Sequence, residues 1–438
     1  MRVFDYGFVA NWVFYRMNTD LDYIQDLKLK SFITGMRAES VAFWLLCFYI
    51  MLEYLRPQNM YPVLDFIPWG QAAILGCFAS VFATNNKMGS YGAMDKMFVA
   101  LTVLVILSVL FAYDSAVFIK YWSTYASWIL MYFCMVAIVT TPSRLFLFAI
   151  FFVLINLKLS QHGARTFAMR GFSFSGYGLS GSPGWFHNSG ELALQMVVMF
   201  SMSLSLLIHM KQYFVSKYRW WLLLGLFPGT AALTAIGSSS RGGQLALVVV
   251  LLLLAAKAKN FVRNMVALGL VVLIGLYFLP DSQKDRFLTM GEDETSELRL
   301  LHWKHALVTL DDNPLGIGYK NWLTYYSQNF NVDRVQQIHN TSLQAFVELG
   351  WPGGILFHLT IIMTLIMNRR SRKEMSKLGG AKGDAIASVA QGVNLGLVGT
   401  FVASFFMSVL WYPMYWLAFA MTSVIRKISM ENHRVENR

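Results

Sequence analysis

The sequence predicts an all-α polytopic membrane protein with about twelve transmembrane helices and one long, partly helical exported loop. Of the 438 residues, 56% are hydrophobic and only 14% are charged, and the mean hydropathy is +0.48. A soluble chain usually carries about 25% charged residues. The apolar residues also recur in blocks of about 18–25, the length that a helix needs to cross about 30 Å of hydrocarbon.

The chain begins with a segment that is too polar to be a secretory signal peptide. Residues 1–37 include Asp5, Asp20, Asp22 and Asp26, and we predict a cytoplasmic, interfacial amphipathic segment. The apolar blocks that follow predict twelve spans near 38–55, 66–85, 95–112, 115–140, 143–158, 190–208, 219–237, 242–257, 264–280, 341–367, 386–409 and 411–428.

Charged residues in the loops predict the orientation. Cytoplasmic loops carry an excess of Lys and Arg, and the strongest basic cluster is Arg369–Lys373. The loop 281–340 has six Lys and Arg against nine Asp and Glu, which suits an exported loop. Both termini are then cytoplasmic. The predicted organisation is a membrane domain of nine helices (38–280), a periplasmic catalytic loop (281–340), three final transmembrane helices (341–428) and a cytoplasmic tail (429–438).

The composition argues against several classes of function. The net charge of +12 does not indicate nucleic-acid binding, because the basic residues are scattered through short loops and do not gather on one soluble face. Cys47, Cys77 and Cys134 all fall inside predicted spans, so no disulfide framework is expected. A transporter or flippase stays open as an alternative. It predicts ionisable groups near mid-bilayer and often internal repeats, whereas this sequence shows few central charges and no repeat.

Arg241 is the first candidate for a functional residue. It lies at the outer mouth of a predicted span, after Ser238–Ser240 and before Gly242 and Gly243. An arginine there is costly unless it meets an anion or the membrane interface. The glycines would let the backbone approach a bound group, and the helix that starts here directs its positive end towards it. The alternative is an arginine that snorkels to the interface.

Further arginines occur in the two long exported segments. Arg286 and Arg299 lie in the loop 281–340. Arg165 and Arg170 lie in the other exported segment, which spans about residues 159–189. Guanidinium groups bind phosphate oxygens in pairs of hydrogen bonds, so converging arginines suit a diphosphate. Arg299 also falls on a stretch with helical spacing, in which Leu300, Trp303 and Leu307 form the apolar stripe expected to face the membrane domain. The alternative for each arginine is a solvated surface charge.

Histidines supply the candidates for proton transfer. His339 and Asn340 stand where the exported loop re-enters the membrane, and a histidine can take a proton from a sugar hydroxyl. The alternative is a helix-capping pair, with Asn340 as the N-cap. His187 and Asn188 form a similar but weaker His-Asn pair at another predicted entry into the membrane. His302 and His305 lack further ligands at metal-binding spacing, so we expect surface histidines, no metal and no cofactor.

These motifs together resemble the O-antigen ligase and O-antigen polymerase superfamily, membrane glycosyltransferases that use polyprenyl-diphosphate sugars. The similar segments occur in the expected order between about residues 185 and 355. They are Phe186–Leu194, Ser240–Gly243, Arg299 with Trp303, Asn313–Gly318, His339–Gln344 and Glu348–Gly354.

The resemblance implies the donor and the mechanism. The donor would be a glycan on undecaprenyl diphosphate at the outer leaflet of the bacterial inner membrane. Arg241 and Arg299, with Arg286, would hold the diphosphate, and His339 would activate the acceptor hydroxyl for inverting displacement. No metal is implied. Asn340, Arg165, Arg170 and His187 are secondary candidates for binding the diphosphate or the glycan.

The resemblance leaves the acceptor open. Ligases transfer the glycan to lipid A–core, polymerases extend a second lipid-linked repeat, and other relatives modify protein serines or threonines. The segment Tyr54–Gln58 is similar to some exopolysaccharide-associated members and favours a polymerase, whereas the single long late loop favours a ligase. We predict a glycosyltransferase of the O-antigen ligase type that acts in lipopolysaccharide biosynthesis, with lipid A–core as the acceptor.

Overall fold

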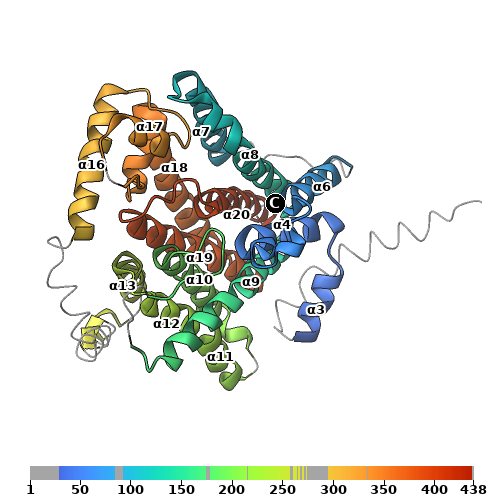
Figure 1. Ribbon diagram of the computed structural model, residues 1–438. Coiled ribbons are helices and arrows are strands. Elements are labelled where there is room, and N and C mark those ends of the chain that lie inside the picture. Colours follow the sequence, from blue (N-terminus) through green and yellow to red (C-terminus); the bar gives the residue numbers. More distant parts are fainter. Residues whose placement is uncertain are drawn as a thin grey trace, which may run out of the picture.

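The protein is described here from a computed structural model (Figure 1). The structure describes residues 29–83, 92–173, 178–214, 216–256, 260–263, 265–266, 269–270, 273, 294–332 and 334–436. Every regular element within these ranges is a helix, which confirms the predicted all-α class.

The helices follow one another with short connections. The first group is α3 (Leu29–Arg37), α4 (Val41–Leu55), α5 (Pro57–Met60), η1 (Pro62–Leu64), α6 (Trp69–Ala83), α7 (Ala93–Leu107), η2 (Ser108–Phe111), α8 (Ser115–Ile138) and α9 (Pro142–Met169). The second group is α10 (Ser189–His209), η3 (Lys211–Tyr213), α11 (Lys217–Leu224), the π-turn η4 (Gly225–Gly229), α12 (Thr230–Gly237) and α13 (Arg241–Ala256). The last group is α16 (Glu294–Asp312), α17 (Trp322–Asn329), α18 (Thr341–Leu378), α19 (Gly380–Ser404) and α20 (Pro413–Glu436).

Seven helical segments of the described chain are long and apolar enough to cross a membrane, and each overlaps a predicted span. The protein is therefore a multi-pass membrane protein, and the described residues contain seven such segments where twelve spans were predicted for the whole chain. Within the described residues the apolar helices α6 and α13 have 15 and 16 residues, fewer than a full span needs, so their spans stay predictions. The predicted span 264–280 lies largely outside the described residues. The seven are Ala93–Phe111, α8, α9, α10, Lys217–Gly237, α18 and α19.

Helices α10 and α19 pack along each other in the centre of the bundle, and α9, α13 and α18 also pack on α19. Glycines of α19 permit the close approach. A Cβ on Gly392 would lie 2.7 Å from the Met202 sulfur, and one on Gly399 would lie 2.5 Å from Val197. Such small residues matter in a membrane, because apolar helices gain little from mutual burial when lipid is equally apolar.

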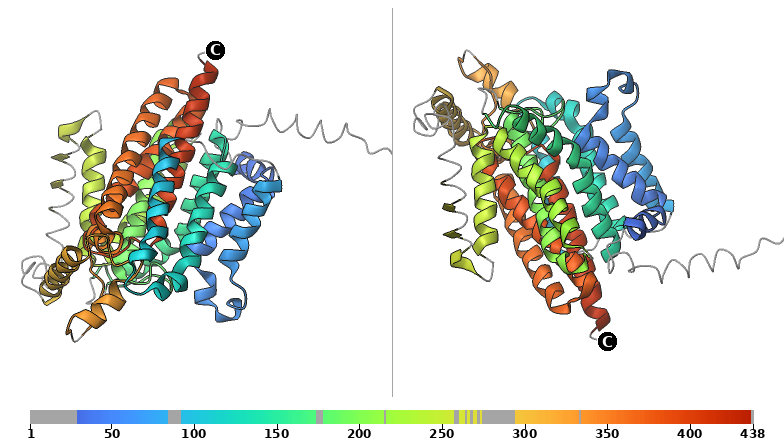
Figure 2. Two further views of the ribbon diagram at one scale, coloured as in Figure 1. Left: turned by 90° about the horizontal axis from the view of Figure 1, so that it is seen from above. Right: turned by 90° about the horizontal axis from the view of Figure 1, so that it is seen from below.

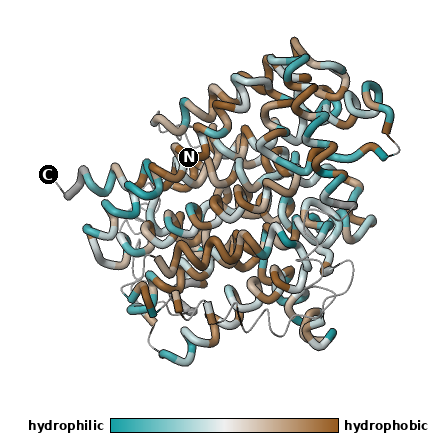
Figure 3. The backbone as a smooth tube through the Cα atoms, turned by 90° about the vertical axis from the view of Figure 1, so that its left-hand side faces the viewer, coloured by the Kyte–Doolittle hydropathy of each residue, from teal (hydrophilic) through white to brown (hydrophobic). Residues whose placement is uncertain are grey.

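The two ends of the bundle differ in structure. In both views of Figure 2 the long helices run roughly parallel, with α16 and α17 at the end opposite to the C-terminus. Figure 3 shows hydrophobic positions along much of the length of the helices. Helix α8 begins beside the α16–α17 region, since the backbone N–H of Asp114 donates to Asn321 Oδ1 at 3.0 Å. Its other end therefore marks the opposite face of the bundle.

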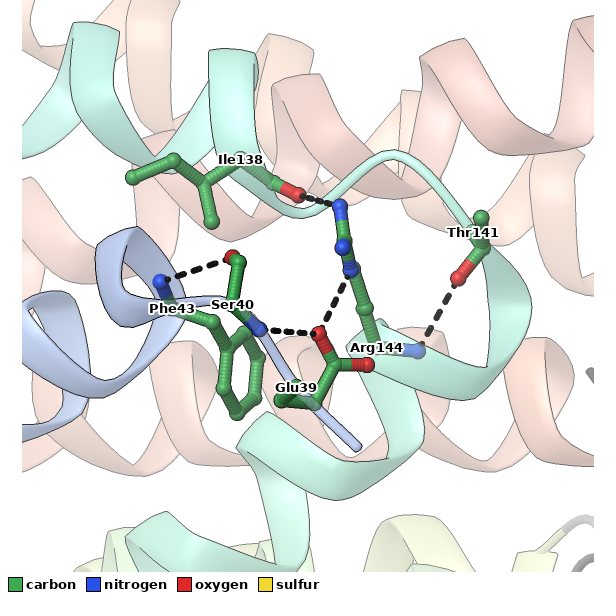
Figure 4. A network of polar contacts seen from close by, with 6 residues as sticks. All are labelled: Glu39, Ser40, Phe43, Ile138, Thr141 and Arg144. Atoms are coloured by element: carbon green, nitrogen blue, oxygen red, sulfur yellow. Dashed lines mark hydrogen bonds and ion pairs between the residues drawn. The ribbon is translucent and has the colours of Figure 1, made fainter. Parts of the chain in front are cut away.

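At that opposite face an arginine joins three helices (Figure 4). Arg144 Nε donates to Glu39 Oε2 at 2.9 Å, and Arg144 Nη1 donates to the Ile138 carbonyl at the end of α8 at 3.0 Å. The hydroxyls of Ser40 and Thr141 cap the first turns of α4 and α9. A paired arginine that also satisfies a helix-end carbonyl has a structural role here.

Candidate active site

A cavity of about 1040 Å³ opens at the end of the bundle that carries α16 and α17. Its walls come from the starts of α10, α13 and α18, from α8 and α16, and from the segment between α19 and α20. The predicted residues Arg241, Arg299 and His339 all line this cavity. The fold thus brings together three side chains that are far apart in the sequence.

Arg241 is the first residue of α13. The hydroxyl of Ser240 accepts a hydrogen bond from the Gly243 backbone N–H at 3.3 Å and so caps the helix. Gly242 lines the cavity. A Cβ on Gly243 would lie 2.3 Å from the Cβ of Ala193, so this glycine lets α13 pack on α10.

Arg299 reaches the cavity from α16. Of the predicted apolar stripe, Trp303 packs against buried residues of α16 and α17, but the two leucines do not. Leu300 and Leu307 are 56% and 50% exposed, whereas His302 and Ala306 are buried. The apolar stripe identified the packed face only in part, because apolar side chains of a membrane protein can equally face lipid.

His339 stands immediately before α18 and is held by its backbone. Its N–H donates to Ser408 Oγ at 2.9 Å. Asn340 caps α18, with its Oδ1 accepting from the Leu343 N–H at 3.1 Å. Asn340 is thus a buried cap that does not line the cavity, whereas His339 lines it. The role of His339 in proton transfer stays a prediction.

The surroundings of His339 keep its imidazole neutral. Burial, followed by the charge of Arg299 and the neighbouring His302, lowers the pKa of His339 to about 4. Burial and then His305 also lower the pKa of His302. A neutral imidazole is the form that can accept a proton, and His339 is in this form at pH 7.

Strained backbone is concentrated at the cavity. Five non-glycine residues of the described chain have positive φ, and three of them line the cavity, namely Ser239 (58°), Lys320 (56°) and His339 (57°). Such conformations cost free energy and persist where the surroundings fix them, most often at functional sites. The backbone around the cavity is therefore held in one defined shape.

Sequence reasoning did not identify Lys320, Glu348 and Trp411 as site residues, although all three line the cavity. The buried carboxylate of Glu348 accepts hydrogen bonds from the Lys320 backbone N–H (3.1 Å), from Gln344 Nε2 (3.3 Å) and from Trp411 Nε1. The Lys320 ammonium lies 4.4 Å from the centre of the Tyr121 ring, and burial lowers its pKa against the opposing charge of Glu348. The sequence did carry a signal, because an acidic residue within an apolar span is costly and usually functional.

Comparison with known families identifies the segment that supplies most of these residues. Residues 226–358 match the family model described as O-Antigen ligase. This part of the chain is similar to the O-antigen ligase family. A comparison with curated proteins found no match. The ligase-family segment contains Arg241, Arg299, His339 and Glu348, and it supports a membrane glycosyltransferase of the ligase or polymerase kind.

Two motifs of the ligase-family segment contact each other. Helix α18 is interrupted at Gly350, which has φ +68°, and the interruption leaves backbone groups without helical partners. The loop 314–318 satisfies these groups. The bonds are Ile317 N to Val347 O (2.9 Å), Gly318 N to Glu348 O (2.9 Å) and Trp351 N to Pro314 O (3.0 Å).

Glycine is required on both sides of this contact. A Cβ on Gly316, which has φ +88°, would lie 2.4 Å from the backbone N of Gly350. A Cβ on Gly350 would lie 2.4 Å from the carbonyl carbon of Leu315. Two backbones meet here without side chains between them, and this contact holds the segment before Lys320 next to Glu348.

The remaining candidates do not gather at the cavity. Arg165 and Arg170 are exposed at the end of α9 and do not line it. His187 is also exposed, and its carbonyl accepts from the Gly181 N–H at 3.1 Å. Arg286 lies outside the described residues. The structure thus groups Arg241, Arg299 and His339 without Arg165, Arg170 or His187.

The expected surface position of the two α16 histidines was wrong. His302 is only 3% exposed. His305 is half-buried, with Nδ1 3.1 Å from the Tyr326 hydroxyl and its ring stacked on Phe330 at 4.2 Å. These histidines belong to the contact between α16 and α17. The described residues contain no group of three or more His, Cys, Asp or Glu that could hold a metal ion.

Proposed function

We propose that the protein transfers a glycan from undecaprenyl diphosphate to an acceptor hydroxyl at the periplasmic face of the bacterial inner membrane. Both termini are then cytoplasmic. The observation that carries the proposal is that Arg241, Arg299 and His339 line one cavity at an end of the membrane bundle. The ligase-family match over residues 226–358 supports the class of reaction.

In this proposal the diphosphate binds between Arg241 and Arg299. Both guanidinium groups can form paired hydrogen bonds with phosphate oxygens. The first turn of α13 also lines the cavity, and the N-terminal end of a helix carries partial positive charge that favours anions. The two arginines neutralise the charge that grows on the leaving diphosphate, and no metal takes part.

His339 is the base of the proposed reaction. Its neutral imidazole removes the proton from the acceptor hydroxyl while the hydroxyl oxygen attacks the anomeric carbon of the donor sugar. The bond from this carbon to the diphosphate oxygen breaks, and its electron pair leaves with undecaprenyl diphosphate. One displacement inverts the configuration at the anomeric carbon. The proton later passes from His339 to water.

The apolar part of the cavity suits the lipid tail of the donor. Leu245 and Val248 follow Arg241 by one and two turns on the same side of α13, and both line the cavity. Leu245 is 46% exposed. A diphosphate at Arg241 would therefore have an apolar surface beside it, along which the polyprenyl chain can leave the cavity between helices.

The preferred acceptor is lipid A–core. A polymerase would use a second lipid-linked repeat and a protein glycosyltransferase would use serine or threonine, whereas a transporter or flippase would break no glycosidic bond. The deciding experiment in cells is glycan analysis of a deletion strain complemented with the wild type or with His339→Ala. Loss of long glycan from lipid A–core with polymer accumulating on undecaprenyl diphosphate supports a ligase. Single repeats on undecaprenyl diphosphate and on lipid A–core indicate a polymerase.

The direct test uses the purified protein in lipid nanodiscs with an undecaprenyl-diphosphate-linked glycan and a core oligosaccharide acceptor. We expect transfer by the wild type and its loss in Arg241→Ala. Arg165→Ala is the matched control, because this arginine is exposed and lies outside the cavity. Equal transfer by Arg241→Ala and the wild type would contradict the proposed role of Arg241.

A further inference from the structure

A second, polar cavity of about 670 Å³ lies at the end of the bundle opposite to the active-site cavity. Helix α10 connects the two, because its first residue, Ser189, lines the active-site cavity and its last residue, His209, lines the polar cavity. With a rise of about 1.5 Å per residue, the 21 residues of α10 separate the two sites by about 30 Å. The polar cavity is therefore separate from the catalytic residues, at the end that is cytoplasmic in the proposed orientation.

Lysine and tryptophan side chains of one short segment line the polar cavity. This segment follows α10 and supplies Lys211 from η3 and Lys217, Trp220 and Trp221 from α11. The Lys211 ammonium lies 4.6 Å from the centre of the Trp220 ring, and Trp220 Nε1 donates to the Leu207 carbonyl of α10 at 2.9 Å. Neither lysine forms an ion pair with another residue that the structure describes. Both ammonium groups are therefore available to an anion.

The carboxylate that lines the polar cavity is bound by protein groups. Asp384, near the start of α19, accepts through Oδ2 from Gln212 Nε2 at 2.6 Å and from the Tyr213 hydroxyl at 2.8 Å. These bonds fasten η3 to α19, which gives the acid a structural role. Arg372 of α18 adds positive charge beside His209. With two lysines against one carboxylate in its lining, the polar cavity carries net positive charge.

An apolar groove of about 140 Å³ adjoins the polar cavity and shares Phe214 with it. It lies between α9, α10 and the segment α11–η4, and it follows α10 from Met210 back to Ser203, about 10 Å along the helix. Of the described residues that line it, only Ser203 is polar, and its hydroxyl donates to the Met199 carbonyl at 2.7 Å. Leu154 in its wall is 40% exposed, so the groove is accessible from the side of the bundle. An apolar space of this size stays dry and accepts an apolar group.

The polar cavity and the apolar groove together match the two parts of a phospholipid. Tryptophan is enriched where a protein crosses the membrane interface, and Trp221 is 63% exposed beside the polar cavity. Basic pockets between transmembrane helices on the cytoplasmic side suit anionic headgroups. The groove continues from the lysines into the apolar part of the bundle, as an acyl chain continues from its headgroup. A water-soluble phosphate would use the lysines and leave the groove without a role.

We propose that the polar cavity and the apolar groove form a binding site for an anionic phospholipid of the cytoplasmic leaflet. Its phosphate lies between Lys211 and Lys217, and one acyl chain lies in the groove. The site is separate from the donor and acceptor sites, and only the choice of leaflet depends on the proposed orientation. The lipid contacts α9, α10 and α11 together, so its binding stabilises the folded protein.

The test is native mass spectrometry of the purified, delipidated full chain, titrated with phosphatidylglycerol or with zwitterionic phosphatidylcholine. We expect the wild type to bind its first phosphatidylglycerol about tenfold more tightly than phosphatidylcholine. The double variant Lys211→Gln/Lys217→Gln should weaken the binding of phosphatidylglycerol about 25-fold, since each lysine near an anionic headgroup contributes about fivefold. Lys373→Gln/Lys377→Gln is the matched control, because both lysines are exposed at the same end of the bundle and lie outside the polar cavity.

A second variant tests the groove. Leu154→Trp narrows the groove and leaves the lysines in place, so it should also weaken the binding of phosphatidylglycerol. Glycerol 3-phosphate, which has the phosphate without the chains, should compete poorly. Strong competition by glycerol 3-phosphate, with no effect of Leu154→Trp, would indicate a site for small phosphates and overturn the proposal.

The remaining outcomes are equally decisive. Equal binding of the two lipids by the wild type, or an equal loss of binding in the two double-lysine variants, would show a general attraction to the basic end of the bundle and overturn the site. Thermal unfolding shows whether each variant keeps its fold. Lys217→Gln alone supplies the comparison if the double variant does not fold, since Lys211 is the lysine that contacts Trp220. Lipid binding is measured directly, so absence of glycan transfer would contradict the proposed function and leave this site intact.

Discussion

The imidazole rings of His302 and His339 lie with their centres 6.2 Å apart, one on α16 and the other at the start of α18. His302 is buried, and its Nδ1 has no hydrogen-bond partner within the described structure. Burial, then the charge of Arg299 and then the neighbouring His302, disfavour a positive charge on His339. The imidazole of His339 therefore stays neutral down to a pH well below the usual pKa of histidine.

This arrangement predicts an unusual pH dependence. Because the pKa of His339 in the folded protein is about 4, kcat/KM for the donor should stay level as the pH falls from 8 to about 5 and then decline near pH 4. Folding stability has the matching sign, because the unfolded chain binds a proton near pH 6.5 and the folded protein does not, so stability falls between pH 6.5 and 4. The pH profile of initial rates checks this, and a decline centred at pH 6.5 would rule out the neutral, shielded base.

Replacement of the base should remove most of the activity. His339→Ala is expected to lower kcat by about 10²–10⁴-fold, the usual contribution of general base catalysis, without loss of donor binding. Turnover with a saturating donor gives kcat, and co-purification of the lipid-linked donor reports binding. His187→Ala, an exposed histidine outside the cavity, is the control. Retention of wild-type kcat in His339→Ala would assign the proton transfer to another group.

The geometry of the guanidinium should matter as well as its charge. Arg299→Lys keeps the charge but loses the paired hydrogen bonds, so we expect transfer to fall by about tenfold or more. The measurement is kcat/KM for the donor, with Arg170→Lys as the control, because Arg170 is exposed at the end of α9. Activity of Arg299→Lys equal to that of its control would show that Arg299 contributes only its charge.

The glycine contact predicts a change in stability. Gly316→Ala places a Cβ against the backbone of Gly350 at a positive φ, and it should destabilise the protein by about 1–3 kcal/mol. The midpoint of thermal unfolding in detergent checks the effect. Gly70→Ala on α6 is the matched control, since no atom lies within 4 Å of its added Cβ. Equal midpoints for the two variants would show that the loop and α18 can separate at little cost.

The sequence identified the residues that stand out against an apolar background. Arg241, Arg299 and His339 were predictable because a charged or titratable side chain at the edge of a membrane is costly and needs a reason. Trp185 and Trp411, which line the active-site cavity, were not predictable, because an aromatic residue in an apolar chain has the same sequence signature whether it packs in a core or lines a cavity. Only the structure shows that rings far apart in the chain line one cavity.

The fold was predicted in class but less well in detail. Apolar blocks identify helices, yet they do not say which side of a helix meets protein, and the stripe predicted for α16 was wrong for Leu300 and Leu307 but right for Trp303. The spans predicted at α6 and α13 stay predictions, because the described residues of these helices number 15 and 16. The link between the loop 314–318 and the interrupted α18 could not be predicted, because each motif alone looks like an ordinary turn or helix break.

The contact between Gly316 and Gly350 also limits how related sequences can diverge. Neither glycine can gain a side chain while the opposite backbone stays in place, and an insertion in the loop 314–318 would displace all three of its bonds to α18. Substitutions at the two positions should therefore occur together. A chimeric chain of two distant homologues, joined between these glycines, would fold only if both homologues form this contact with the same backbone geometry.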